Sequence, residues 1–336
     1  MINCSKTKIW KIKYNLIMWF GNVLLRPFPR FHHCFTAWYR DRAYYKKLIA
    51  DYPNGKQLAI FMCDGKVNHA GLTDRLYSIL SVFKLCKENN IDFAIHWVHP
   101  FALQDFLQPN SYNWIIDNQK ITYDKRISEP IVNFPYHTKS TLLQKIKRTH
   151  KKQLHIYTSA LFITDFSQFV SQLFNELFKP TDKLQQQIDF HYAKIGGNYL
   201  GLTFRFQHQL GDFNEYNLKS TLSESEKTEL IQKCIEQIYR FHEEYPQHPV
   251  VFVTSDSVTF LNEAKKIEFV YIVEGNRIHV DCSAETDEHT VTFLDMFLLS
   301  KAQAVFTCGT ENMYVISGFG RFAAAINNVP FEVREF

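Results

Sequence analysis

The sequence predicts an α/β protein built on doubly wound parallel sheets, and two observations carry this prediction. Short apolar runs rich in β-branched and aromatic residues, such as residues 199–206 and 250–254, have the length and composition of buried strands. Stretches with apolar residues at helical spacing, such as residues 223–245, alternate with these runs along the chain. Because strands that alternate with helices usually pair in parallel, this order indicates sheets that are covered by helices on both faces.

Composition indicates a folded globular chain and excludes several other classes. Of the 336 residues 46% are hydrophobic, which is enough for one large core or two ordinary ones, and 12 glycines and 11 prolines exclude a low-complexity chain. A formal charge of +4 is too mild to indicate nucleic-acid binding. The seven cysteines are scattered without CxxC spacing, so neither a disulfide framework nor a zinc site is indicated, and a reducing cytoplasm is expected.

Residues 1–50 form a basic, aromatic segment that we separate from the folded domains. Ten lysines and arginines stand against the single acid Asp41 in residues 1–47. The apolar core of the segment, residues 16–25, has about half of the roughly 20 residues that a membrane-spanning helix needs, and no small-residue cleavage site follows it. Two interpretations stay open: a helix packed on the domain, or an amphipathic segment, residues 1–30, that rests on the cytoplasmic face of the membrane.

Residues 51–185 are predicted to form the first domain, which opens with a β-α-β unit. Residues 57–63 and 91–98 have strand patterns, and apolar residues recur at helical spacing from Leu72 between them. The loop after the first strand lies at the C-terminal edge of the sheet, where parallel sheets bind ligands. This loop and the helix start contain four candidate site residues: His69, Gly71, Asp74 and Arg75.

The remainder of the first domain carries shorter patterns. The run of basic residues over positions 139–152 is best explained as the solvent-exposed face of a helix. The helical connection at its end is where we place the boundary between the domains. We expect short elements at residues 114–116 and 154–157, the basic run over residues 139–152, and helices over residues 166–178 and 181–195.

Residues 186–336 are predicted to form a second domain, in which strand and helix patterns alternate regularly. Such a succession predicts a doubly wound parallel sheet with its ligand site at the C-terminal ends of the strands. Strands are expected over residues 199–206, 250–254, 269–273, 278–280 and 304–307, and helices over residues 223–245, 258–266, 291–300 and 315–319.

One arginine lies at the end of a buried strand of the second domain. Arg205 closes the apolar run of residues 199–206. Because a guanidinium cannot be deprotonated and is costly to bury alone, this placement indicates a bound anion such as a diphosphate. The alternative is an internal ion pair with a nearby carboxylate, such as Asp212, that only braces the fold. The sequence leaves both interpretations open.

Three loops of the second domain follow strand ends and are expected to converge on one crevice. They are residues 207–215, 255–257 and 308–312. The third precedes a predicted helix whose backbone N–H groups are suited to hold a phosphate. The sequence contains neither a Walker A pattern nor GxGxxG, so a P-loop nucleotidase and a dinucleotide enzyme have no direct support.

Four segments in order resemble the inverting fucosyltransferases of the GT-B type, which have two Rossmann-like domains facing each other across a cleft. This group includes bacterial α-1,2- and α-1,6-fucosyltransferases, nodulation fucosyltransferases and protein O-fucosyltransferases. Residues 69–75 are similar to their N-terminal glycine loop, and residues 201–206 to their strand that ends in a His-x-Arg-Arg-Gly-Asp type motif. Residues 253–257 are similar to their Ser-Asp segment, and residues 293–310 to their closing block of Asp, Ser and Thr.

The resemblance implies a metal-independent glycosyltransferase without a cofactor, which moves a sugar from a nucleotide sugar, GDP-fucose being favoured, to a glycan acceptor. Surface polysaccharide or lipopolysaccharide synthesis in the cytoplasm is the implied setting. Arg205 would compensate the charge on the departing β-phosphate. The general base would be Asp212 or Glu215, on the loop near Arg205, or else His69 or Asp74 from the other domain. The acceptor would lie near the loop of residues 69–75. The nucleotide would contact Arg205, Ser255, Asp256, Gly309, Thr310 and Asn312.

The chain departs from the family's pattern at three positions. Thr203 stands where the family often has His, Phe206 stands where a second Arg is common, and Asp212 comes later than the usual Asp. The arginine role therefore transfers to Arg205 alone, and the donor sugar, the acceptor, the linkage, the base and the oligomeric state stay open. Two alternatives remain: a transferase that uses another nucleotide sugar, and a catalytically silent module that binds a nucleotide or a sugar.

Overall fold

The structure is a computed structural model that describes most of the chain beyond residue 55. The described residues are 56–67, 69–133, 139–159, 166–212, 222–275 and 285–336, together with the single residues 16, 35, 220, 277, 280 and 283. The predictions for the N-terminal segment and for Glu215 therefore fall outside the described residues, apart from residues 16 and 35.

The chain forms two compact units that interleave along the sequence. The first contains the described residues up to 62 together with residues 85–96 and 116–158, and the second contains residues 63–84, 97–115 and 159–336. The sequence suggested one division, between residues 185 and 186. The assignment of an acceptor-side and a donor-side domain stays a prediction.

The first unit is built around a four-stranded sheet in the order β2-β1-β5-β4. Both β1 and β4 pair in parallel with β5. The sequence patterns missed β4, which contains Pro130. A proline is tolerated there because β4 is an edge strand and needs no ladder bond on its outer side. The elements are β1 (Leu58–Cys63), β2 (Asp92–Trp97), β4 (Ser128–Asn133), β5 (Gln153–Thr158) and α4 (Lys139–Arg148).

The helix predicted from Leu72 is confirmed as α3 (Leu72–Glu88). Apolar residues at positions 76, 79, 80 and 83 are fully buried, which is the helical repeat that the sequence showed. Asp74 lies in the first turn and Lys87 in the last, where each charge complements the helix dipole. The N-terminal part of α3, through residue 84, belongs to the second unit.

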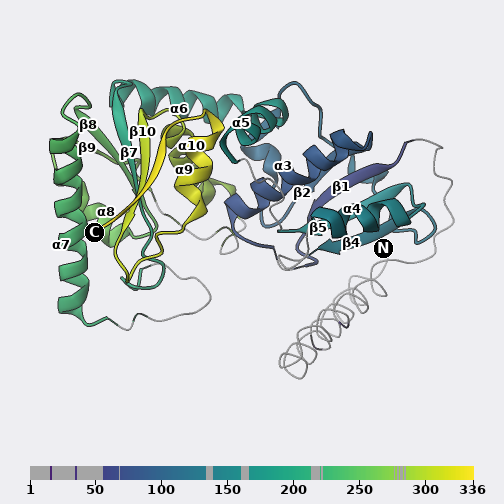
Figure 1. Ribbon diagram of the computed structural model, residues 1–336, viewed down its shortest axis with the longest axis horizontal. Helices are drawn as coiled ribbons and strands as arrows, with labels where there is room; N and C mark the ends of the chain where they lie inside the picture. The colour runs from purple at the N-terminus through teal and green to yellow at the C-terminus, as the bar shows by residue number, and fades with distance from the viewer. Residues whose placement is uncertain are drawn as a thin grey trace, which may run out of the picture. The chain divides into compact units, whose positions relative to one another are not determined.

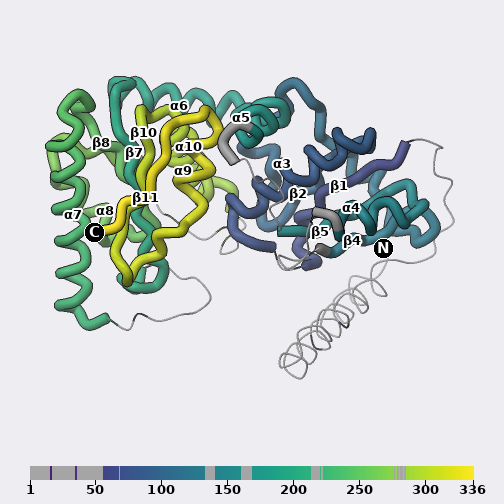
Figure 2. The backbone as a smooth tube through the Cα atoms, in the orientation of Figure 1, coloured from purple at the N-terminus to yellow at the C-terminus, as the bar shows by residue number. Residues whose placement is uncertain are grey.

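The second unit contains a five-stranded parallel sheet in the order β11-β10-β7-β8-β9. Strands β8 and β9 are added on one side of β7, and β10 and β11 on its other side. The direction in which successive strands are added therefore reverses between β7 and β10. Open parallel sheets bind ligands at such a reversal. Figure 2 shows the last strand, β11, beside β10. The strands are β7 (Tyr199–Phe204), β8 (Val250–Ser255), β9 (Val270–Tyr271), β10 (Ala304–Gly309) and β11 (Phe331–Glu335).

Helices cover both faces of this sheet, which is why every residue of β7 is buried. Leu200, Leu202 and Phe204 of β7 pack in one core with α7 and α8. Helices α9 and α10 cover the opposite face of the sheet (Figure 1). On that face the Tyr199 hydroxyl donates to the Leu298 carbonyl at 2.7 Å. The helices are α6 (Asp182–Ile195), α7 (Glu224–Glu244), α8 (Val258–Ala264), α9 (Thr286–Leu299) and α10 (Gly318–Ile326).

The predicted fold class is confirmed, while several element boundaries differ. The last helix begins at Gly318, not at residue 315, because Ser317 is its N-cap. Of residues 114–116, where a short element was expected, Ile115 makes a β-bridge, and residues 278 and 279 lie outside the described residues. Within the described part of the chain, no helix is both long and apolar enough to cross a membrane. The remaining elements are α5 (Phe166–Leu177), β3 (Leu107–Pro109), β6 (Phe178–Pro180) and short 3-10 turns at Leu103–Asp105 and Asn118–Lys120.

The close approach of α10 to the sheet predicts that Gly320→Ala destabilises the protein. A Cβ at Gly320 would lie 2.5 Å from Thr203 Cγ2 and 3.0 Å from Thr307 Oγ1, two stiff side chains on neighbouring strands. We expect a loss of about 1–3 kcal/mol in the free energy of unfolding, measured by denaturant titration. Gly318→Ala is the matched control in the same helix, since its Cβ would come no closer than 3.5 Å to any atom outside its own neighbourhood. A Gly320→Ala protein as stable as this control would contradict the packing argument.

Candidate functional site

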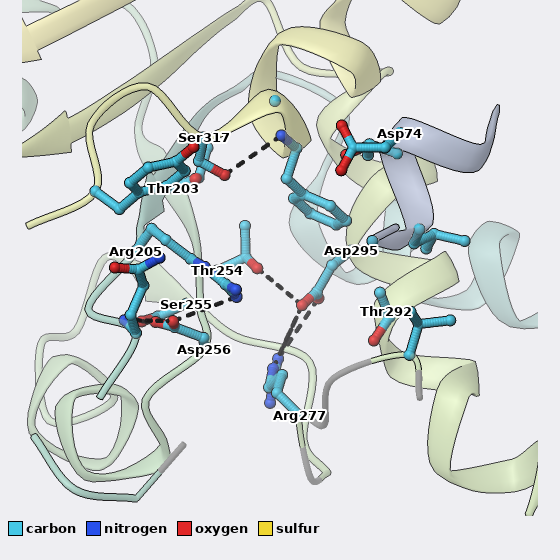
Figure 3. Close-up of a pocket in the computed structure, with 18 of the residues that line it drawn as sticks. Asp74, Thr203, Arg205, Thr254, Ser255, Asp256, Arg277, Thr292, Asp295 and Ser317 are labelled. Atoms are coloured by element: carbon cyan, nitrogen blue, oxygen red, sulfur yellow. Dashed lines mark hydrogen bonds and ion pairs between the residues drawn. The ribbon is translucent and has the colours of Figure 1, made fainter. Parts of the chain in front are cut away.

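A cavity of about 480 Å³ lies in the second unit at the C-terminal ends of β7 and β8. Its lining also includes the N-terminal turns of α3 and α10 and one side of α9. Figure 3 shows polar side chains from these elements pointing toward one another across the cavity. This is the sheet edge at which the sequence predicted a ligand site.

Arg205 lines the cavity and forms an ion pair with Asp256 at the end of β8. Arg205 Nη1 lies 3.3 Å from Asp256 Oδ2, and the arginine side chain is 23% exposed whereas the carboxylate is 3% exposed. The backbone N–H groups of Phe206 and Gln207 donate to the two Asp256 oxygens at 2.8 and 2.7 Å. The carboxylate therefore ties together the ends of two neighbouring strands.

Opposing influences act on the Asp256 carboxyl. Burial raises its pKa above the ordinary value, while the Arg205 guanidinium and the backbone N–H groups of Phe206 and Gln207 work in the opposite direction. The sequence considered Asp212 as the internal partner of Arg205, whereas among the described residues the structure shows an ion pair of Arg205 with Asp256. The predicted contact of Ser255 and Asp256 with a nucleotide stays a prediction, and both residues line the cavity.

A second ion pair, between Arg277 and Asp295, also lines the cavity. Arg277 Nη2 lies 3.3 Å from Asp295 Oδ2, and their side chains are 7% and 2% exposed. Thr254 Oγ1 donates to the same carboxylate at 2.8 Å, and two backbone carbonyls, of Val273 and Gly275, accept from the guanidinium. Burial raises the pKa of Asp295, and Arg277 acts against this rise.

Sequence reasoning did not assign either residue of this second pair. Asp295 lies within the segment 293–310 that carried the family resemblance, so a signal for it was present. Arg277 lies in an irregular loop after β9, where no periodic pattern or motif marks it. Only the fold, which brings the loop to α9, shows that the two residues belong to one cavity.

The N-terminus of α10 supplies the third group of polar atoms in the cavity. Ser317 accepts from the Phe319 N–H at 3.4 Å, and both residues line the cavity together with Gly318. A helix N-terminus carries partial positive charge and exposed N–H groups that suit an anion. The sequence predicted that this helix begins at residue 315, three residues before its observed start at Gly318.

Of the four acceptor-side candidates, two line the cavity and two do not. Gly71 and Asp74 line the cavity, and Asp74 is exposed. Arg75 is buried and holds the preceding loop, because its Nε donates to the Ala70 carbonyl at 2.6 Å and its Nη1 to the His99 carbonyl at 3.3 Å. His69 accepts from the Gly65 N–H at 3.2 Å and is not among the lining residues.

The remaining predicted site residues lie away from this cavity or outside the described residues. Asp212 Oδ2 accepts from Ser257 Oγ at 2.9 Å and from the Thr259 N–H at 2.7 Å, so it caps the start of α8. Thr310 and Asn312 line a different cavity, which runs along α7. Gly309 packs closely against Val315 and Met313. The described residues contain no group of three or more His, Cys, Asp or Glu side chains that could hold a metal ion.

The buried Arg277–Asp295 pair predicts a pH-dependent loss of stability on Arg277→Met. Removing the arginine leaves the carboxylate buried without its cation, at an expected cost of about 3–5 kcal/mol near neutral pH. Since the folded pKa of Asp295 is raised, the folded state holds its proton more tightly than the unfolded state. Stability therefore falls as pH rises from the ordinary carboxyl value, about 3.9, through the folded pKa.

Thermal unfolding between about pH 5 and pH 8 checks this prediction. Arg277→Met is expected to lose less stability at the acidic end than at the basic end. In the double variant with Asp295→Asn, the cavity holds no buried charge at these two positions, so we expect a recovery that is larger at the basic end. A loss from Arg277→Met of equal size at every pH would contradict the assignment.

Comparison with known proteins shows the fold of the chain. No model of a protein family matches the sequence, and no curated protein matches it. Among solved structures, a mutant of Arabidopsis thaliana FUT1 in complex with GDP has a TM-score of 0.56 at 13% identity, over 84% of this chain and 71% of that chain.

Two structures of the α-1,6-fucosyltransferase NodZ are also similar. NodZ soaked with GDP-fucose has a TM-score of 0.53 at 16% identity, over 81% of this chain and 93% of that chain. NodZ from Bradyrhizobium has a TM-score of 0.52 at 15% identity, over 80% of this chain and 92% of that chain. At these identities the likeness shows the fold alone, and it agrees with the predicted α/β fold class with parallel sheets.

Proposed function

We propose that this protein is a fucosyltransferase-like glycosyltransferase that moves a sugar from a GDP-sugar to a glycan acceptor. The observation that carries the proposal is Arg205, a cation at the reversal point of a parallel sheet, lining the same cavity as the N-terminus of α10. Two of the similar structures support GDP as the nucleotide, since the FUT1 mutant is in complex with GDP and NodZ was soaked with GDP-fucose.

The polarity of the cavity supports one direction for the nucleotide. Arg277, Asp295 and His289 form a buried polar end that is suited to the hydrogen-bonding edge of a base. Figure 3 shows Ser317 and Arg277 on opposite sides of the cavity. We place the diphosphate at Arg205 and the α10 N-terminus, and the sugar beyond it on the exposed side.

In this arrangement Arg205 acts on the leaving group. As the bond between the sugar C1 and the β-phosphate oxygen breaks, negative charge accumulates on the nucleoside diphosphate. A fixed guanidinium stabilises that charge more in the transition state than in the substrate complex. Asp256 holds the guanidinium in place through the 3.3 Å ion pair. Phe206 cannot share this task, because it is fully buried in the core beside Phe260.

Asp74 is the carboxylate best placed to activate the acceptor hydroxyl. Asp74, Asp256 and Asp295 all line the cavity, and the latter two are buried. Asp74 is exposed at the first turn of α3. We therefore assign it the role of general base ahead of Asp212 and Glu215, which stay candidates. Inversion at C1, action in the cytoplasm on a surface polysaccharide or lipopolysaccharide, and independence of a metal ion follow from the family resemblance alone.

Nucleotide binding and hydrolysis of GDP-fucose distinguish this proposal from two alternatives. A transferase with another donor would be stabilised by UDP, CMP or TDP rather than by GDP, since a ligand that binds only the folded state raises its apparent stability. A silent binding module would bind GDP but would not release it from GDP-fucose. Thermal shift with the four nucleotides and an assay of GDP release cover both cases.

Arg205→Ala is expected to reduce GDP release from GDP-fucose by a factor of about 10²–10³, because the leaving-group charge loses its fixed donor. The steady-state rate, with water or an added glycan as acceptor, is the measurement. Arg205→Lys retains a positive charge beside Asp256 and is the control for folding, expected to lose less. A folded Arg205→Ala protein that keeps most of its turnover would remove this mechanism.

Asp74→Asn is expected to lower GDP release by a factor of about 10²–10⁴ while leaving GDP affinity within twofold of the wild type. The physical reason is that the amide keeps the shape of the side chain but cannot accept the proton. Asp212→Asn and Glu215→Gln are the comparison variants. If either of them loses more activity than Asp74→Asn at equal stability, the base assignment moves to that residue.

A further inference from the structure

The segment between β10 and α10, residues 310–317, presents two large apolar side chains on the exposed side of the cavity. Tyr314 is 41% exposed and Ile316 is 75% exposed, and both line the same cavity as Arg205. Among the large apolar side chains that the structure describes as exposed, Ile316 has the greatest exposed fraction. Such surface at a ligand cavity indicates that a ligand covers it.

The backbone of this segment is held in place from beneath. Met313 is 8% exposed, and Val315 packs so closely on Gly309 that a Cβ there would lie 2.7 Å from Val315 Cγ1. The Tyr314 N–H donates to the Arg205 carbonyl at 3.0 Å, which joins the segment to the end of β7. Met313 and Val315 pack inward and alternate with Tyr314 and Ile316, which are exposed. We name the two exposed side chains the Tyr314–Ile316 wall.

The wall adjoins the proposed position of the diphosphate, and Ser317, which follows Ile316 in the chain, lies across the cavity from Arg277 (Figure 3). The hydrogen bond from Tyr314 to Arg205 fixes it to the residue that would hold the leaving phosphate. The hydrogen-bonding groups suited to a base, Arg277 and Asp295, are buried, whereas the wall is exposed. The part of the donor that comes next after the β-phosphate, on the exposed side, is the sugar.

We propose that the Tyr314–Ile316 wall contacts the sugar of the nucleotide-sugar donor and selects a 6-deoxyhexose over the corresponding hexose. This inference rests on the proposed function. The C–H face of a pyranose packs well on an aromatic ring, and a methyl group at C5 gains contact with Ile316. A primary hydroxyl in the same place would lose water without gaining a hydrogen-bond partner from Ile316.

The test compares three ligands by isothermal titration calorimetry: GDP, GDP-L-fucose and GDP-L-galactose. The last two differ only by the hydroxyl at C6. We expect the wild type to bind GDP-L-fucose about tenfold more tightly than GDP-L-galactose, since an apolar surface rejects an added hydroxyl by at most about 10². Ile316→Thr is expected to bring this ratio close to one, and Tyr314→Ala to weaken both sugar nucleotides several-fold while GDP binds within twofold of the wild type.

The matched controls make the same two substitutions, Ile to Thr and Tyr to Ala, at exposed positions outside the cavity. Ile115 and Tyr239 are 48% and 46% exposed and do not line this cavity, so Ile115→Thr and Tyr239→Ala should leave all three affinities unchanged. Equal weakening of GDP and GDP-L-fucose by the two wall variants would overturn the inference, because the wall would then contact the nucleotide. Equal affinity of the wild type for GDP-L-fucose and GDP-L-galactose would overturn it too. Absence of GDP binding to the wild type would instead refute the proposed function, and the inference with it.

Discussion

The ion pair between Arg205 and Asp256 is the interaction around which the cavity is organised. It joins the ends of β7 and β8, and the same carboxylate accepts the backbone N–H groups of Phe206 and Gln207 as the chain leaves the sheet. A buried carboxylate without these partners would be costly, so the acid, the arginine and the loop stabilise one another. Arg205 is thereby held at the cavity, and its side chain stays 23% exposed.

The second ion pair gives the cavity two different ends. Arg277 and Asp295 are both nearly inaccessible and are further bonded by Thr254 and by backbone carbonyls, so this end is rigid and polar. The opposite end is apolar and exposed, because Gly309 lets Val315 and Met313 pack inward while Tyr314 and Ile316 face outward. An elongated ligand with a polar base, a charged middle and a sugar at its far end fits this gradient. This change in polarity along the cavity is the physical argument for the proposed GDP-sugar donor.

Much of the fold could be predicted from local patterns, and the errors have specific causes. The strands β7, β8 and β10 were evident because both faces are buried and the runs are continuously apolar. Strand β4 was missed because Pro130 argues against a strand except at an edge, and edge position is not visible in a sequence. The start of α10 was misplaced because the capping role of Ser317 depends on how the preceding segment folds onto Gly309.

By itself, the sequence determined the alternation of strands and helices, the sheet edge at which the cavity lies, and Arg205 as the cation at that edge. These depend on hydrophobic periodicity and on the chemistry of single residues, which act over a few positions. Only the tertiary structure decided which acid pairs with Arg205, that Asp212 caps α8, and that Arg277 meets Asp295. Those pairings join residues 18 to 51 positions apart through the order of the strands, and no local pattern encodes that order.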